Sequence, residues 1–344
     1  MEVGLSIAQM QRGMDVEGFY LLKAAFAKVT ASGKPFLSAV LADTSGTIEA
    51  KVWDYSGPIG ERDVGKVLKV RGSVSDYRGM PQLTVDKLRL AEDNDRVDVS
   101  KLVSVAPIDR EAGYDEVKAL VATIEDLDYR AVCEQMLHHH EAAFRTIPAA
   151  KSVHHAWVGG LLEHTLSVAT LCLRFCDHYP DLDRQTLLAG AICHDLGKIW
   201  EFSGGLANDY TDAGRLVGHI NLCLGKLDRH LAKSGLDEEL ILHFQHLILS
   251  HHGLYEYGSP RLPQTAEAFA LHYADNIDAK ITQSRSLFGE LEDGESGWSP
   301  YQKSLERQLF QAPKTPEAES RKPRTSKRTA AEPEAPRLNQ CSLL

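Results

Sequence analysis

The chain contains 344 residues, of which 43% are hydrophobic and 25% are charged, and its formal net charge is −10. This size and composition are typical of a globular protein with room for two domains. No apolar run approaches the ~18 residues that cross a bilayer, and the N-terminus lacks a signal-peptide pattern, so we expect a cytoplasmic protein with no membrane partner.

The charge is unevenly distributed along the chain. Residues 17–91 carry 11 Lys and Arg against 8 Asp and Glu, and residues 313–344 carry 7 against 4, so the acidic excess lies in residues 92–312. An acidic region is suited to holding cations, and a mildly basic region is suited to docking a polyanion. A surplus of this size also occurs on ordinary solvated surfaces. Composition alone therefore leaves nucleic-acid binding open.

Residues 17–92 have the pattern of β-strands. β-Prone runs such as PFLSAVLAD and TIEAKVWD are separated by turn residues, among them Ser32-Gly33 and Arg78-Gly79. The pattern predicts five strands, with the longest break between the third and the fourth. This order favours a small closed barrel of the OB type. An open sheet that serves only as packing for a second domain is the alternative.

A short N-terminal segment, residues 1–16, precedes the strand region. Three further segments follow it. Residues 93–113 are polar and predict a linker. Residues 114–311 show the 3.6-residue periodicity of amphipathic helices, as in GLLEHTLSVATLCLRFC and EELILHFQHLILSHH. Residues 312–344 are rich in Pro, Lys, Arg and Glu and lack apolar periodicity, so we expect a disordered tail.

Histidine and aspartate recur in the helical region at positions that suit metal ligation. His194-Asp195 closes the apolar helix TLLAGAICHDLG, and His251-His252 ends another apolar helix. His164, His219 and Asp275 lie on or beside further apolar helical stretches. A lone histidine such as His164 is usually a satisfied core residue. The repetition of these residue types against apolar helices instead predicts one shared site for divalent cations.

The order of these residues, H…HD…H…HH…D, is similar to that of the HD-domain phosphohydrolases, an all-helical superfamily that binds one or two divalent metals. The surrounding sequences HHAWVGGLLEHTLSVA, AGAICHDLGKIWEF and LILSHHGLYEYGSPRLPQT resemble the YhaM family of 3′→5′ exoribonucleases, in which an OB-like domain stands in front of the HD domain. The resemblance covers roughly residues 15–310. It implies a multi-domain α+β protein, with an N-terminal five-stranded OB-type β-barrel followed by an all-α HD-domain helical bundle.

The resemblance also implies the metal ligands. One metal would be held by His164, His194, Asp195 and Asp275, and the additional ligands of two-metal members would be His219, His251 and His252, with Asp195 bridging. Mn²⁺ is the metal expected from the family, and by ligand type Fe or Co is also compatible. Three-metal relatives place a glutamate one helical turn before the first histidine, where this chain has Gly160. We therefore expect one or two ions per chain.

Asp195, Lys198 and His155 are the candidates for catalysis. Lys198 follows His194 by four residues and would contact a phosphate oxygen if the helix continues that far, although a surface lysine at a helix end has the same pattern. His155 is a candidate to protonate the leaving oxygen, with a structural role as the alternative. The run His138-His139-His140 lies outside the motif order and predicts a solvated face.

Nucleic-acid contacts are expected mainly on the barrel. Trp53, Tyr77 and Arg78 are candidates for stacking on bases, and Lys69 is a candidate for the phosphate backbone. Trp53 lies on an alternating strand and could equally belong to the core. In the helical region, Arg261 follows the paired histidines and is a candidate to clamp a phosphate with two hydrogen bonds.

The sequence therefore predicts a metal-dependent 3′→5′ exoribonuclease that hydrolyses single-stranded RNA to nucleoside 5′-monophosphates, with single-stranded DNA as an alternative partner and a homo-oligomer as a further option. A phosphohydrolase acting on a small nucleotide is a second hypothesis, disfavoured because HHGLYEYGSP replaces the GYP-type motif after the paired histidines. A non-catalytic nucleic-acid-binding protein with a structural metal site is the third, disfavoured because Asp195 and all the histidines are present.

Overall fold

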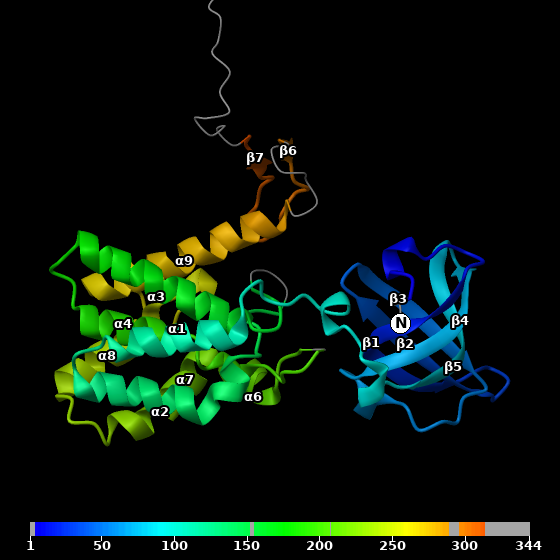
Figure 1. Ribbon diagram of the computed structural model, residues 1–344, viewed down its shortest axis with the longest axis horizontal. Coiled ribbons are helices and arrows are strands. Elements are labelled where there is room, and N and C mark those ends of the chain that lie inside the picture. Colours follow the sequence, from blue (N-terminus) through cyan, green and yellow to red (C-terminus); the bar gives the residue numbers. More distant parts are fainter. Residues whose placement is uncertain (1–3, 152–154, 207, 289–295, 314–344) are drawn as a thin grey trace, which may run out of the picture. The chain divides into compact units, whose positions relative to one another are not determined.

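The computed structural model describes residues 4–151, 155–206, 208–288 and 296–313, and Figure 1 labels its elements. Residues 1–286 and residues 287–344 form two compact units. The first unit contains a β-barrel and, later in the sequence, a helical bundle. Within the described ranges, no helix combines the length and the apolar character that crossing a bilayer requires.

The N-terminal barrel is closed by five strands. They are β1 (Asp15–Val29), β2 (Pro35–Asp43), β3 (Gly46–Trp53), β4 (Val67–Tyr77) and β5 (Met80–Leu90). The strand order is β1-β2-β3-β5-β4, and β4 pairs with β1 to close the barrel. Neighbouring strands are antiparallel except β3 and β5, which are parallel. The predicted five-stranded OB-type barrel is confirmed, and the open-sheet alternative is wrong.

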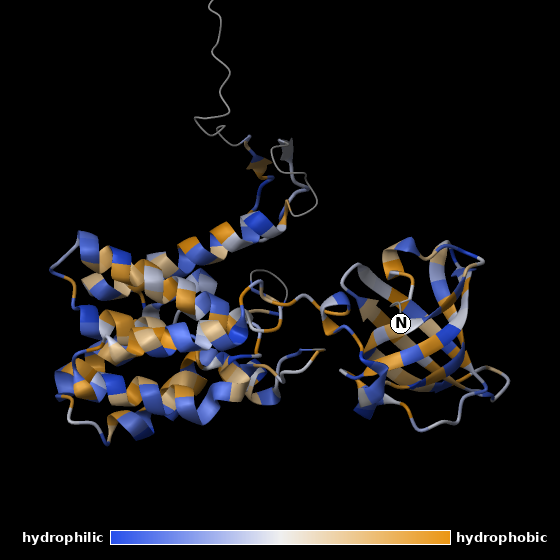
Figure 2. Ribbon diagram, viewed as in Figure 1, coloured by the Kyte–Doolittle hydropathy of each residue, from blue (hydrophilic) through white to orange (hydrophobic). Residues whose placement is uncertain are grey.

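Alternation of side chains decides which face of each strand fills the barrel. On β3, Ile48, Ala50 and Val52 are buried, and Glu49 and Trp53 between and after them are exposed. Figure 2 shows the matching alternation of hydrophobic and hydrophilic residues over the barrel strands. This two-residue period is what a strand with one buried face requires. Trp53 therefore belongs to the outer surface and not to the core.

The helical bundle follows short 3₁₀ turns and is built from α-helices of 4 to 21 residues. These are α1 (Arg110–Ala122), α2 (Leu127–Phe144), α3 (Gly160–His178), α4 (Arg184–Cys193), α5 (Lys198–Glu201), α6 (Asp212–Val217), α7 (His219–Leu231), α8 (Glu238–Ser250) and α9 (Ala266–Ser286). Asp109, Asp126 and Asp183 cap α1, α2 and α4, because each carboxylate accepts hydrogen bonds from backbone N–H groups of the first turn.

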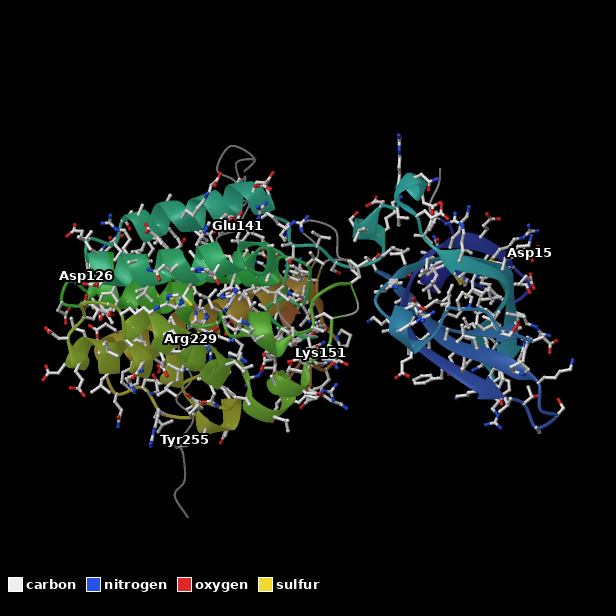
Figure 3. All side chains as sticks on the ribbon, turned by 90° about the horizontal axis from the view of Figure 1, so that it is seen from below. Asp15, Asp126, Glu141, Lys151, Arg229 and Tyr255 are labelled. Carbon is white, nitrogen blue, oxygen red and sulfur yellow. The ribbon has the colours of Figure 1, made fainter. Side chains whose placement is uncertain are left out.

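Helix α4 lies at the centre of the bundle. Every residue from Thr186 to Cys193 is buried, and α4 contacts α1, α2, α3, α8 and α9. Figure 3 shows side chains filling the space between the helices. The polar side chains that follow directly on this helix, His194 and Asp195, are buried as well. The position of α4 therefore decides the surroundings of the His194-Asp195 pair at its end.

The helical pattern stops earlier than predicted. Helix α9 ends at Ser286, and the described residues of the second unit form a two-stranded sheet, β6 (Gly297–Trp298) with β7 (Phe310–Gln311). The expected helical pattern up to about residue 311 is thus wrong for residues 297–311, where Gly297 and Pro300 are unfavourable for a helix. Residues 314–344 of the predicted tail lie outside the described residues.

Candidate metal centre

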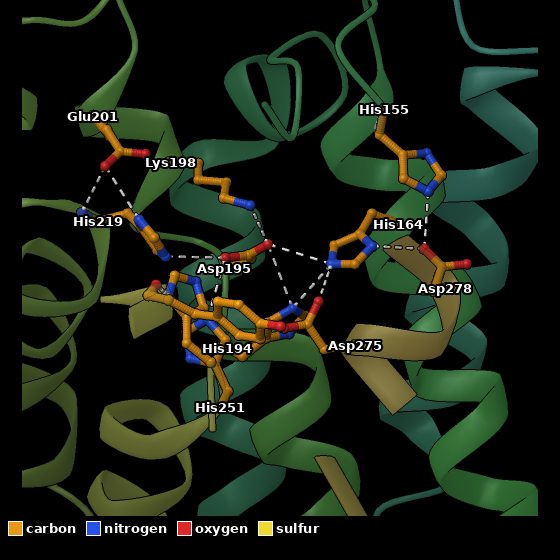
Figure 4. Close-up of polar contacts among 12 residues, drawn as sticks. His155, His164, His194, Asp195, Lys198, Glu201, His219, His251, Asp275 and Asp278 are labelled. Atoms are coloured by element: carbon orange, nitrogen blue, oxygen red, sulfur yellow. Dashed lines mark hydrogen bonds and ion pairs between the residues drawn. The ribbon is translucent and has the colours of Figure 1, made fainter. Parts of the chain in front are cut away.

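Five helices bring the predicted ligands together in the middle of the bundle (Figure 4). His164 lies on α3 and Asp275 on α9, whereas the other ligands come from helix ends. The pairs His194-Asp195 and His251-His252 follow the last residues of α4 and α8, and His219 is the first residue of α7. Residues that are up to 111 positions apart therefore meet in one place, as the spacing of the motif predicted.

The turn after α4 depends on a glycine. A Cβ atom on Gly197 would lie 1.9 Å from the backbone carbonyl oxygen of His219. Since only glycine lacks this atom, Gly197 permits the start of α7 to pack against the turn. This close approach brings the His219 ring to Asp195. Gly160 is similarly restricted, because its Cβ would lie 2.0 Å from the carbonyl oxygen of His155, so a glutamate cannot occupy this position without backbone movement.

The first group of ligand atoms surrounds one carboxylate oxygen of Asp195. His164 Nε2 lies 3.4 Å from Asp195 Oδ2, 3.2 Å from Asp275 Oδ1 and 3.3 Å from His194 Nε2. His194 Nε2 lies 3.5 Å from the same Asp195 Oδ2. Atoms that bind one ion at about 2.1 Å lie roughly 3.0 to 3.4 Å apart in octahedral or tetrahedral arrangements. The four side chains therefore have the spacing of a single metal site.

The second group surrounds the other oxygen of Asp195. His219 Nε2 lies 3.4 Å from Asp195 Oδ1, and His251 Nε2 lies 3.6 Å from it. His252 joins this group, because His219, His251 and His252 can each offer one ligand atom within 4.8 Å of the others. One carboxylate thus faces two groups of imidazoles with its two oxygens. This is the arrangement of a carboxylate that can bridge two ions.

Hydrogen bonds on the far side of each ring fix the orientation of the histidines. His194 Nδ1 and His251 Nδ1 lie 2.8 Å from the carbonyl oxygens of Ala191 and Ile248, one turn earlier in their own chain segments. A carbonyl oxygen only accepts, so each Nδ1 carries the proton. The Nε2 atoms that face Asp195 are then unprotonated in the neutral rings and have a lone pair to offer, which is the form that binds a metal.

Three atoms of the centre are buried without a hydrogen-bond partner among the residues that the structure describes. They are Asp195 Oδ1, His219 Nε2 and His251 Nε2. Leaving a buried polar atom unsatisfied costs about 1–3 kcal/mol, more for a charged group. All three belong to the second group and point at one another. A divalent cation would satisfy them together, so the residues present fit a metal.

The pKa values in the centre also fit cation ligation. Burial alone would raise the pKa values of Asp195 and Asp275. The charge of Lys198 and contacts with His194 and His164 lower the pKa of Asp195 well below its ordinary range, and the hydrogen bond and charge of His164 do the same for Asp275. Burial, together with repulsion from neighbouring imidazoles, lowers the pKa of His252 to about 3. The carboxylates are therefore ionised and His252 is neutral at neutral pH, as metal binding requires.

A second carboxylate, which the sequence analysis missed, holds the outer edge of His164. Asp278 Oδ2 lies 2.7 Å from His164 Nδ1 and 2.8 Å from His155 Nε2, and Ser167 Oγ donates to Asp278 Oδ1. Burial would raise the pKa of Asp278, but these hydrogen bonds lower it. Asp278 follows Asp275 by three residues on α9, and this helical spacing was a signal that both point to the same side.

His155 lies on the outer side of His164, away from the metal-facing Nε2. Its Nδ1 is 3.0 Å from Glu163 Oε2 and its Nε2 contacts Asp278. Burial alone would lower the pKa of His155, but the two carboxylates raise it. Contacts of this kind hold a ligand in position. The catalytic role predicted for His155 stays a prediction, and its surroundings favour positioning of His164 through Asp278.

Lys198 and Glu201 of α5 both contact the centre. Lys198 is buried and its Nζ donates to Asp195 Oδ2 at 2.6 Å, although α4 ends before it and α5 begins with it. Glu201 Oε1 lies 3.1 Å from both the backbone nitrogen and Nδ1 of His219. Glu201 was missed by the sequence analysis, and it holds His219 as Asp278 holds His164. Lys198 and Glu201 are three residues apart on α5, a spacing that places both on the same side of the helix.

The candidates for nucleic-acid contact do not form one surface. Trp53 is 50% exposed and ends β3, whereas Tyr77 ends β4 and Arg78 lies in the turn between β4 and β5. Since β3 and β5 are parallel, with Glu49 opposite Gln82, this turn lies at the end of the strand pair away from Trp53. Lys69 on β4 is 3.5 Å from Glu17. Arg261 is exposed in the segment between α8 and α9.

Comparison with known proteins assigns the helical region. The HD domain family matches residues 161–280. This span contains every predicted metal ligand. Residues 161–280 form an HD domain. The HD domain supports a metal-dependent phosphohydrolase, a class that binds divalent metals, and the residues near Asp195 could hold such a metal. A family described as putative helicase also matches, over residues 115–200.

Two solved structures that match the chain come from Methanococcus maripaludis. One is the solution structure of the second OB-fold domain of replication protein A, with 18% identity, 26% of this chain and 95% of that chain covered, and a TM-score of 0.21. The other is a crystal structure of a domain of replication protein A, with 19% identity, 26% and 94% coverage, and a TM-score of 0.22.

Proposed function

We propose that this chain is a 3′→5′ exoribonuclease that hydrolyses single-stranded RNA to nucleoside 5′-monophosphates with the help of divalent metal ions. The observation that carries the proposal is the placement of Asp195, whose two oxygens face two separate groups of imidazoles. A bridged pair of ions suits the in-line displacement of a phosphodiester. The resemblance of the surrounding sequence to the YhaM family supports RNA as the substrate.

The residues would divide the work as their contacts suggest. His164, His194 and Asp275 would hold one ion and His219, His251 and His252 the other, with Asp195 shared. When bound, the ions would supply an activated water and charge neutralisation at the phosphate. Lys198, 2.6 Å from Asp195, is close enough to the centre for its ammonium group to balance negative charge on the phosphate oxygens. Mn²⁺ is the expected metal, and nitrogen-rich ligands also suit Fe or Co.

The outer face of β1, β2 and β3 offers a surface for the bases. Lys28, Phe36 and Trp53 are paired across these strands, and Phe26 lies in the neighbouring row opposite Ser38. Phe26 is 51% exposed, and the rings of Phe36 and Trp53 lie 5.1 Å apart. Exposed aromatic rings beside lysines bind single strands by stacking and charge attraction. We propose this face, and not the Tyr77 turn, as the main contact for RNA.

The direct test is the product pattern from a labelled RNA. The full-length protein is incubated with Mn²⁺ and a 5′-labelled single-stranded RNA, and we expect a ladder that shortens from the 3′ end together with nucleoside 5′-monophosphates. The Asp195→Asn protein should lose the activity by several orders of magnitude, whereas Asp177→Asn, a matched change at an exposed position of α3, should retain it. An unchanged ladder from Asp195→Asn would contradict the proposal, as would hydrolysis confined to small nucleotides.

A further inference from the structure

A groove between α2 and α7, away from the metal centre, is lined by positive and imidazole side chains. The groove has a volume of about 380 Å³, within the range of small-molecule sites. Its lining residues are Gln135, Met136, His139, His140, Lys226, Arg229, His230 and Lys233. These residues carry three formal positive charges and include three histidines. Among the described residues that line this groove, none is acidic.

The cations in the groove are not neutralised by the protein. Of the residues that the structure describes, none places a carboxylate within ion-pair distance of Lys226, Arg229 or Lys233. Lys226 instead lies over the ring of Trp200, 5.3 Å from its centre. Arg229, which Figure 3 labels, is exposed. Uncompensated like charges gathered in one hollow repel one another unless an anion binds between them.

The histidines of the groove are held in a fixed orientation. His139 Nδ1 lies 2.6 Å from the carbonyl oxygen of Gln135, and His230 Nδ1 lies 2.8 Å from Gln135 Oε1. Both rings thus direct Nε2 away from Gln135. Burial and the surrounding positive groups lower the pKa of His230, which is the direction that an anion would reverse.

We propose that the groove between α2 and α7 binds a phosphate group, as the free anion or as the phosphate of a small nucleotide. Lys226 and Arg229 supply the charge, and an Nε2 proton on His139 or His230 supplies a hydrogen bond when that ring is protonated. Arginine and lysine are the residues that bind phosphate most strongly by charge-assisted hydrogen bonds. The volume leaves room for a sugar or base beside the phosphate.

The groove also adjoins the helix that serves the metal centre. The ring of His140, where α2 departs from helical geometry, packs edge-on against Trp200 with centres 4.8 Å apart. Trp200 belongs to α5, which carries Lys198 and Glu201. A ligand in the groove would therefore contact side chains that pack on α5. Binding itself does not rest on the proposed RNA hydrolysis.

The test measures binding in the full-length Asp195→Asn protein, which keeps hydrolysis out of the experiment. Side-chain NMR signals of histidine are followed while inorganic phosphate, adenosine 5′-monophosphate or a short single-stranded RNA is added, each at constant ionic strength. We expect saturable shifts of His139 and His230. The double change Lys226→Ala with Arg229→Ala should weaken binding about tenfold or more.

A matched variant removes two positive charges elsewhere on the bundle, Lys118→Ala with Arg174→Ala, and should leave binding unchanged. Saturation by phosphate and the monophosphate alone identifies a small-anion site, and saturation by RNA alone would overturn that assignment. Equal shifts with potassium chloride would reduce the effect to screening and overturn the proposal. Shifts confined to the histidines near Asp195 would overturn the proposal as well. The RNA ladder assay tests hydrolysis separately, and its result does not depend on any of these binding outcomes.

Discussion

At the scale of single residues, outer carboxylates decide which nitrogen two of the metal-facing histidines present. Asp278 holds His164, and Glu201 holds His219, each through Nδ1. A carboxylate behind a ligating imidazole fixes the ring and increases its basicity. The sequence motif predicted the inner residues, because their types and order are distinctive. It did not reveal the outer ones, since an aspartate three residues beyond a ligand or a glutamate in a short helix has many ordinary uses.

Changing Asp278 to asparagine should weaken metal binding at the group formed with His164. The side chain keeps its size but loses the charge that faces two buried histidines. We expect an affinity for Mn²⁺ that is about 10- to 100-fold lower, measured by titration with paramagnetic resonance detection. Asp177→Asn serves as the control. Unchanged affinity accompanied by a lower melting temperature would assign Asp278 a purely structural role.

Changing Glu201 to glutamine should act on the other group. Glutamine can still accept from His219, but it removes the negative charge beside this ring. The affinity of the ion held with His219 should fall by about 10- to 100-fold while the other ion is retained. Metal analysis of the protein at limiting Mn²⁺ measures the change as a stoichiometry that falls from two towards one. Equal loss of both ions would show that the two groups do not bind independently.

At the scale of elements, the centre is made by the ends of helices that pack around α4. The helical periodicity was sufficient to predict a buried helix that ends in His194-Asp195 and a second that ends in His251-His252. It was insufficient to predict how closely α7 approaches the turn after α4. That approach depends on the missing Cβ of Gly197, which only three-dimensional contacts reveal. The same limit applies after α9, which ends at Ser286, whereas the helical region was expected to extend to about residue 311.

Replacing Gly197 with alanine should displace the start of α7. The added Cβ would lie 1.9 Å from the carbonyl oxygen of His219, so the backbone must move, at a cost of about 1–3 kcal/mol. We expect a lower melting temperature and loss of the ion held with His219. The control is Gly225→Ala on α7 itself, where the Cβ would meet nothing within 4 Å. This change should stabilise the helix by about 0.5–1 kcal/mol. Equal effects of the two changes on metal content would refute the role given to Gly197.

At the scale of the whole molecule, the chain joins an OB-type barrel to a helical region that contains an HD domain. The barrel exposes aromatic rings such as Phe26 and Trp53, whereas the helical region encloses a largely buried cluster of histidines and carboxylates. We propose that the barrel captures the strand and the HD domain hydrolyses it. Strand alternation predicted the barrel, but it left Trp53 open between core and surface. Its exposure follows from the register with β2, where it pairs with Phe36.

Replacing Trp53 with alanine should weaken the capture of long RNA without changing the chemistry. Stacking of a base on an aromatic ring contributes about 1–3 kcal/mol, so we expect the Kd for a long single strand to rise about 5- to 100-fold. The kcat for a dinucleotide should be unchanged. Tyr179→Ala, another exposed aromatic residue, is the control. Equal impairment on the long and the short substrate would contradict the division of roles.

The proposed hydrolysis depends on Asp195 lying between two ions. Anomalous diffraction from crystals grown with Mn²⁺ measures this directly, because each ion gives its own peak. We predict two peaks, one among His164, His194 and Asp275 and the other among His219, His251 and His252, each within about 2.0–2.3 Å of one Asp195 oxygen. The absence of any peak beside Asp195 would contradict the proposed metal pair.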